Sequence, residues 1–101
     1  MIKHIVMFKL FSHAEGGTKA ENIEKMKTML EALPAKLNVI KSFEVGVNYY
    51  QSDRAYDVAL TASFETKDDL EIYRNHPEHI KCAEFILKIR ETAWMVDYEV
   101  E

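Results

Sequence analysis

The sequence predicts an α+β fold in which two helical segments separate four strands. Three observations support this: four stretches alternate between opposite faces, two segments pair a helix cap with an apolar stripe, and the chain has only 101 residues. A chain of that length suits a single domain, residues 1–101. The element order βαββαβ is that of the ferredoxin-like fold, an antiparallel four-stranded sheet with both helices on one face.

Residues 2–11 are expected to form the first strand, because apolar side chains recur at every second position on both of its faces. One face carries Ile5, Met7 and Phe11 beside two lysines, and the other carries His4, Val6, Phe8 and Leu10. The sequence therefore predicts a strand that is apolar on both sides.

A helix is expected over residues 19–36. Thr18 and Glu21 form a capping box, the pattern that satisfies free amides at a helix start. An apolar stripe at helical spacing follows, made of Ile23, Met26, Leu30, Leu33 and Leu37. Pro34 lies inside this stripe, so either the last turn is distorted or the helix ends before Leu33.

The second half of the chain predicts two strands, a divided helix and a last strand. Residues 39–48 and 56–65 alternate, and the polar link between them suits a hairpin with a long loop. Thr66 caps the second helix, which Pro77 divides into two pieces before it ends near Arg90. The last strand, residues 92–100, alternates through Thr92, Trp94, Val96, Tyr98 and Val100.

Two helices cover only one face of such a sheet, so apolar residues on the other face need a partner. These are expected to include one side of the first strand together with Phe43, Val45, Val47, Trp94, Val96 and Tyr98. We therefore expect a homodimer that packs sheet face against sheet face. The alternative is a monomer with a partly polar open face, which the third strand favours through Asp57, Thr61, Ser63 and Glu65.

Composition narrows the classes of partner and location. The chain has 13 Lys and Arg against 17 Asp and Glu, and its net charge of −4 is the wrong sign for a nucleic-acid partner. No apolar run is long enough to span a membrane. Charges interrupt the N-terminal residues where a signal peptide needs an apolar stretch, and the single Cys82 cannot form an internal disulfide. These features predict a cytoplasmic protein without membrane association.

Histidine is the residue type that points to chemistry. His76 and His79 are three residues apart, a spacing that can place both rings on one helix face and, with a third group, bind a metal. Pro77 suits the first position of a helix, which makes His76 a cap residue that points elsewhere. No Cys or carboxylate cluster completes the set, so no metal site is predicted.

Tyr73 and His79 lie on the two sides of the helix break. A phenol that donates or accepts and an imidazole that titrates near neutrality together suit proton abstraction. The alternative is a half-buried aromatic residue and a surface histidine without a joint role. His4 shares a strand face with Val6 and Phe8, so it is either a hydrogen-bonded core residue or part of a cavity wall.

Several of these segments resemble one known family, and the resemblance spans nearly the whole chain. The opening MIKHIVMFKL, the FET after the third strand, LEIYRNHPEH over residues 70–79 and the closing VDY are similar to the stress-responsive dimeric α/β barrel (Dabb) family. The most specific element is Tyr-x-x-His-Pro-x-His combined with Lys-His near the N-terminus. The resemblance implies a dimeric α/β barrel built from two ferredoxin-like sheets. Most members of this family have no established activity.

The resemblance also implies site residues, through a plant polyketide cyclase of this family that works without a cofactor. By this similarity His79 is the base, Tyr73 is the supporting phenol, and the pocket walls are His4, Val6, Phe8, Ile23, Met26, Val58 and Leu60. Two positions depart from that cyclase: Val58 replaces a pocket histidine and Arg90 replaces a tryptophan. Arg90 either pairs with a carboxylate ligand or interacts with the last carbonyls of its helix.

The leading functional hypothesis is a dimer that binds a small apolar carbonyl or phenolic molecule between sheet and helices. One alternative is a cofactor-independent cyclase or isomerase that uses His79 and Tyr73. A second is a cofactor-free monooxygenase acting on a phenol, and a third is a non-catalytic structural dimer whose barrel is packed solid. No cofactor is expected in any of them.

Overall fold

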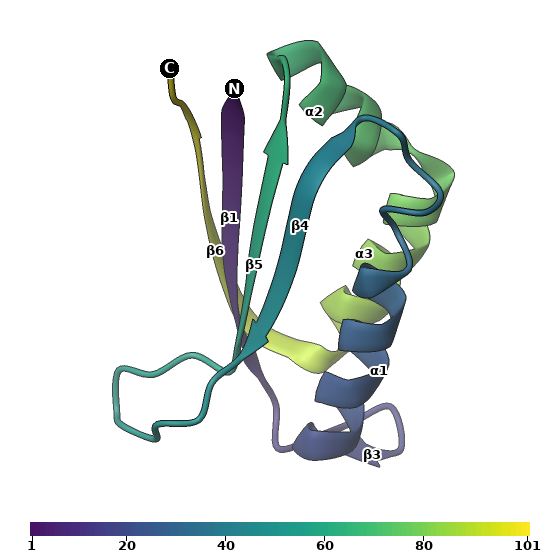
Figure 1. Cartoon of the computed structure of the whole chain (residues 1–101). Coiled ribbons are helices and arrows are strands. Elements are labelled where there is room, and N and C mark those ends of the chain that lie inside the picture. The colour runs from purple at the N-terminus through teal and green to yellow at the C-terminus, as the bar shows by residue number, and fades with distance from the viewer.

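A computed structural model of the chain describes all 101 residues. The four main strands form one antiparallel sheet in the order β4-β5-β1-β6, made of β1 (Ile2–Leu10), β4 (Ile40–Val47), β5 (Val58–Phe64) and β6 (Arg90–Glu99). Three helices cover one face of it (Figure 1), namely α1 (Lys19–Glu31), α2 (Lys67–Asn75) and α3 (Pro77–Ile89). This confirms the α+β, ferredoxin-like fold. None of these helices has the length and apolar character that a membrane crossing requires.

A small hairpin that the sequence did not predict lies between β1 and α1. It pairs β2 (His13–Ala14) with β3 (Gly17–Thr18). Glu15 and Gly16 form its turn with φ angles of 49° and 75°, as a two-residue turn with two left-handed positions requires. Of the two adjacent glycines, Gly16 therefore lies in the turn and Gly17 in β3.

The predicted faces of β1 are confirmed. Its burial alternates along the strand, and the residues that face the helices are all buried: Ile2, His4, Val6, Phe8 and Leu10. This alternation fixes the register, because a shift by one residue would bring Lys3 and Lys9 to the helix side.

Helix α1 begins as predicted and ends early. The Thr18 hydroxyl accepts from the Glu21 amide at 3.2 Å, and the Glu21 carboxylate accepts from the Thr18 amide at 2.9 Å, which completes the capping box. The helix ends at Glu31, which confirms the alternative that it ends before Leu33, because Pro34 lacks an amide and disfavours helix in the residue before it. Leu33 and Leu37 stay buried, held by the turn that follows rather than by the helix.

The break between α2 and α3 is confirmed. Pro77 is the first residue of α3, and His76 caps it by accepting from the Glu78 amide through Nδ1 at 3.1 Å. Helix α3 then passes without a loop into β6, which begins at Arg90, two residues before the predicted start. This direct connection places Arg90 where helix and sheet meet.

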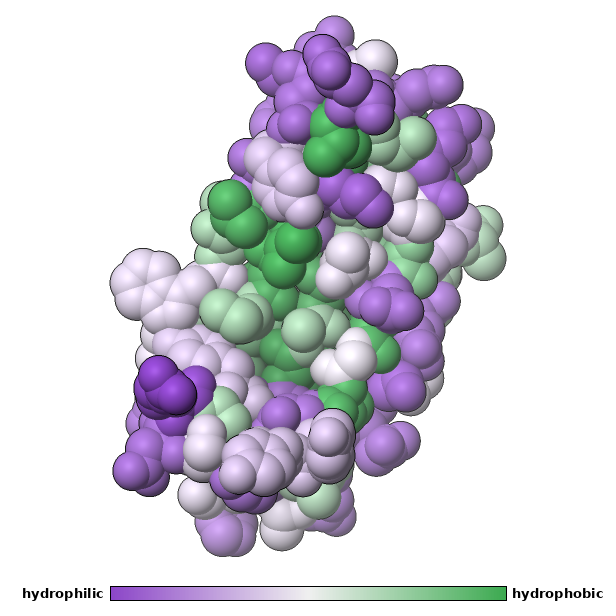
Figure 2. All heavy atoms as spheres, turned by 60° about the vertical axis from the view of Figure 1, so that its left-hand side comes forward, coloured by the Kyte–Doolittle hydropathy of each residue, from purple (hydrophilic) through white to green (hydrophobic).

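The expectation that Phe43, Val45 and Val47 belong to the uncovered sheet face was wrong. In the strand register Phe43 lies opposite Ala62, which lies opposite the helix-facing His4. The uncovered face is therefore apolar only along β1 and β6, in a group that we call the β1/β6 patch: Ile5, Met7, Trp94, Val96 and Tyr98. Figure 2 shows this side of the molecule, with apolar side chains gathered across its middle and hydrophilic ones around them.

Asp57 was expected beside Thr61 on the uncovered face, yet it precedes β5 and is buried. Its carboxylate accepts from the Leu10 amide at 2.8 Å and pairs with Lys19 at 3.3 Å. It therefore ties together the end of β1, the start of α1 and the approach to β5, so its role is structural.

Candidate functional site

A cavity of about 410 Å³ lies between α3 and the helix-facing side of β1 and β6. Its lining is mostly apolar, from Val6, Phe8, Leu30, Leu60, Cys82, Ala83, Ile86, Leu87 and Met95, with polar groups from His4, Tyr73, Arg74, His79 and Arg90. Leu87 and Met95 are 63% and 62% exposed, so the mouth of the cavity opens between α3 and β6. Its volume and its few polar groups are those of a small-molecule site.

The cavity brings together six of the nine side chains predicted for the site. His79, Tyr73, His4, Val6, Phe8 and Leu60 line it. Met26 and Val58 do not line the cavity; they are buried in the core. Ile23 is half-buried against that core and also lies outside the lining.

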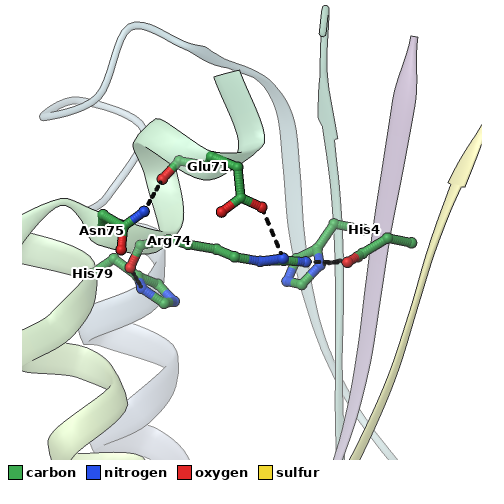
Figure 3. Close-up of polar contacts among 6 residues, drawn as sticks. His4, Glu71, Arg74, Asn75 and His79 are labelled. Atoms are coloured by element: carbon green, nitrogen blue, oxygen red, sulfur yellow. Dashed lines mark hydrogen bonds and ion pairs between the residues drawn. The ribbon is translucent and has the colours of Figure 1, made fainter. Parts of the chain in front are cut away.

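His79 is oriented by a backbone carbonyl. Its Nδ1 lies 3.0 Å from the carbonyl oxygen of Arg74, a residue in the last turn of α2. A carbonyl only accepts, so Nδ1 carries the hydrogen, and in the neutral ring Nε2 keeps its lone pair. Figure 3 shows the His79 ring beside the backbone of Arg74. This is the tautomer that a general base needs.

The surroundings of His79 keep its ring neutral. Burial is the main cause that lowers the pKa of His79, and the positive charges of His4 and Arg74 act in the same direction. The hydrogen bond to the Arg74 carbonyl opposes them, but the net pKa lies below the ordinary 6.5. At neutral pH the ring is therefore ready to accept a proton.

Tyr73 lies close to both histidines. Its ring centroid is 4.4 Å from that of His79 and 6.0 Å from that of His4. The side chain is 1% exposed, and its hydroxyl has no hydrogen-bond partner within the protein. An unpaired buried hydroxyl costs about 1–3 kcal/mol, so the site lacks one acceptor. Burial raises the pKa of Tyr73, which keeps the hydroxyl protonated as a donor.

His4 is held by two residues that sequence analysis missed. Its Nδ1 donates to the Asp97 carboxylate at 2.5 Å, and the guanidinium of Arg74 pairs with the other oxygen of Asp97. Arg74 also pairs with Glu71 at 3.2 Å. The signal that would have found Asp97 is its place in β6 directly opposite His4.

The charge on Asp97 is stabilised by these contacts. Burial alone would raise the pKa of the Asp97 carboxyl, but the hydrogen bond and charge of His4, with the charge and hydrogen bond of Arg74, lower it on balance. Asp97 is therefore a stable acceptor for Nδ1–H of His4, which leaves Nε2 of that ring as its free nitrogen. Figure 3 shows the Arg74 side chain extending from α2 to the region of His4.

His76 lies outside the cavity, whereas Arg90 lines it away from the two histidines. His76 uses Nδ1 as the cap of α3 and does not line the cavity with His79. No group of three or more His, Cys, Asp or Glu side chains is arranged to hold a metal ion. Arg90 does line the cavity, and its side chain makes no ion pair or hydrogen bond.

Comparison with known proteins identifies the family. The model of the stress responsive A/B barrel domain matches residues 2–100. The chain belongs to this family. A dimeric protein of unknown function and ferredoxin-like fold from Bacteroides fragilis NCTC 9343 is 35% identical, with a TM-score of 0.82 over 98% of this chain and 95% of that one. No curated protein matches the chain.

Two further structures share the fold of this A/B barrel protein. A dimeric ferredoxin-like protein of unknown function from Thermobifida fusca YX is 24% identical, with a TM-score of 0.84 over 98% of this chain and 90% of that one. The hydroxynitrile lyase of Passiflora edulis is 16% identical, with a TM-score of 0.80 over 99% of this chain and 93% of that one. At these identities the similarity concerns the fold alone.

The lowered pKa of His79 predicts how its ring titrates. We expect a midpoint below 6.5 in the native protein, measured by histidine-resolved NMR. As pH falls from 6.5 towards that midpoint, the unfolded chain takes up a proton that folded His79 does not, so stability is lost. In urea unfolding, the free energy of unfolding of His79→Gln is expected to fall less over this pH range, because the variant has no histidine to titrate at this position. A native midpoint at or above 6.5 contradicts the burial of the ring described here.

Proposed function

We propose that this protein binds a small carbonyl compound in the cavity and removes a proton from the carbon next to the carbonyl, without a cofactor. The observation that carries the proposal is the Tyr73 hydroxyl, buried without a partner beside a histidine whose Nε2 keeps its lone pair. A ligand carbonyl oxygen is the acceptor that the chain itself does not provide.

The two residues have separate roles in this reaction. His79 accepts the proton through Nε2, and Tyr73 donates a hydrogen bond to the carbonyl oxygen as negative charge develops there. In a ligand with a conjugated double bond the enolate takes the proton back from His79 at the far carbon of that bond, which is an isomerisation. In a ligand with a second carbonyl the enolate carbon attacks that carbonyl, whose oxygen takes the proton from His79, which is a cyclisation. His4 forms the third side of the polar end, its ring fixed by Asp97.

The apolar wall supports this chemistry. Val6, Phe8, Leu60 and Ile86 are buried and give the cavity an apolar wall. In such surroundings the Tyr73 hydrogen bond is stronger than in water, because fewer solvent dipoles compete with it. The same volume argues against the alternative of a barrel packed solid.

The proposed reaction is not taken from the enzyme that shares this fold. The hydroxynitrile lyase of Passiflora edulis shares the fold at 16% identity, so its activity is not transferred to this chain. A cofactor-free monooxygenase remains the alternative chemistry, and consumption of dioxygen with a phenolic substrate separates it from proton transfer.

A deuterium-exchange assay tests the proposed reaction. In D₂O we expect the wild type to accelerate exchange at the carbons beside the carbonyl of 2-nonanone, followed by NMR. His79→Gln is expected to lose about 10²–10⁴-fold of this rate, the range for a general base. Tyr73→Phe is expected to lose about 10²–10³-fold, as for an oxyanion donor.

His13→Gln is the matched control, since this histidine is exposed on the β2–β3 hairpin and outside the cavity. It is expected to keep the wild-type rate. Ketone binding with an unchanged exchange rate in His79→Gln would refute the base and leave a binding protein, and no ketone binding at all would refute the whole proposal.

We also propose that the chain forms a homodimer through the β1/β6 patch. Dimeric relatives, including the 35% identical protein from Bacteroides fragilis, support a homodimer. Trp94 and Val96 are 63% and 52% exposed on a face that no helix covers. The loop between β4 and β5 also projects from the sheet away from the helices, with Tyr49 and Tyr50 exposed (Figure 1).

Two matched variants test whether the dimer forms through the β1/β6 patch. Val96→Asp places an unpaired charge in the buried apolar contact, so we expect monomers by light scattering after size exclusion. Ile72→Asp is the control, because Ile72 is 51% exposed like Val96 but lies on α2, away from the sheet face. A dimeric Val96→Asp, or a monomeric Ile72→Asp, would show that the copies meet elsewhere.

A further inference from the structure

We infer that Arg90 binds a carboxylate at the far end of the cavity, so that the ligand is an oxo acid with its ketone at Tyr73 and His79 and its carboxylate at Arg90. This inference rests on the proposed function and names the class of compound that the same cavity takes. It follows from the position of Arg90, the absence of any partner for it, and the charge of the lining.

The strand register places Arg90 at the opposite end of the cavity from the histidines. Asp97 lies opposite His4, and Arg90 lies opposite Leu10, with the apolar middle of the two strands between these pairs. Six residues along β1 at about 3.3 Å each separate the two ends by about 20 Å of strand. The Arg90 side chain lies in the cavity and shortens that span, so the matching ligand has an alkyl chain between its two polar groups.

Arg90 is the unpaired arginine of the cavity. Arg74, the other one, pairs with Asp97 and Glu71. The backbone amide of Arg90 caps α3 by donating to the Ile86 carbonyl, but its guanidinium makes no hydrogen bond to the last carbonyls of that helix. A half-buried guanidinium without a partner offers the planar pair of donors that a carboxylate accepts.

The charge of the lining favours an anion. No Asp or Glu lines the cavity, so Arg90 meets no competing carboxylate there. Between the two polar ends the wall is apolar, from residues such as Val6, Phe8 and Met95, which suits a methylene chain. A neutral ketone would fill this space and leave the guanidinium without a counter-charge.

The test uses oxo acids of increasing length, 4-oxopentanoate, 8-oxononanoate and 12-oxotridecanoate, each beside its methyl ester. Dissociation constants are measured by NMR titration of the wild-type protein. For a member long enough to reach both ends we expect the acid to bind at least about tenfold tighter than its ester, as for a charge-assisted hydrogen bond. The shortest member is expected to show no such preference.

Two variants assign the preference to one side chain. Arg90→Gln is expected to bind acid and ester equally, because the guanidinium that distinguishes them is gone. Lys88→Gln, which removes an exposed positive charge from the last turn of α3 outside the cavity, is expected to keep the wild-type preference.

The outcomes distinguish a failure of this inference from a failure of the proposed function on which it rests. If acids and esters bind equally to the wild type, or if Arg90→Gln keeps the preference, the carboxylate site is refuted while the ketone site stands. If neither acids nor esters bind, the proposed function fails and this inference fails with it.

Discussion

The polar end of the cavity, formed by His4, Tyr73 and His79, depends on the contacts that Arg74 makes. Its guanidinium pairs with Asp97 on the edge strand, and Asp97 in turn holds Nδ1 of His4. Its backbone carbonyl accepts from Nδ1 of His79. One residue at the end of α2 therefore sets the orientation of both rings, and both keep Nε2 free of protein partners. Tyr73, the preceding residue, is placed near both rings by the same turn of helix.

The cavity itself follows from how far the helices extend over the sheet. The inner strands β1 and β5 are covered, so their helix-facing residues form the core. The edge strand β6 is largely exposed along both faces, because no helix packs over its length. That uncovered strip leaves the space beside α3 open to solvent at Leu87 and Met95. On the reverse face the same strand carries most of the β1/β6 patch, so one strand borders both the site and the proposed interface.

The features that the sequence predicted well are those with a local cause. Strand alternation in β1, the capping box at Thr18 and the helix break at Pro77 each depend on neighbouring residues, and all three are present. The approach of Tyr73 to His79 follows from the same break. Family resemblance added the cavity-lining role of His4, which periodicity alone left open.

The features that the sequence did not predict depend on contacts between distant segments. Which side of β4 faces the helices is set by its register with β5, so Phe43 was placed on the wrong side. Asp97 gains its role only because β6 pairs with β1 at His4, 93 residues away. The family resemblance placed Met26 and Val58 in the pocket wall, but both lie in the core outside the cavity, because the resemblance does not show where the packing leaves a space.

The central claim is that Arg74 and Asp97 hold two histidines with Nε2 free of protein partners beside an unpaired tyrosine hydroxyl. The most direct test is a long-range proton–nitrogen NMR correlation of the histidine rings near neutral pH, which reports the hydrogen on each ring nitrogen. The structure predicts a neutral His79 with its hydrogen on Nδ1. A hydrogen on Nε2 of His79 would contradict the account, because Nε2 would then have no lone pair with which to accept a proton from a ligand.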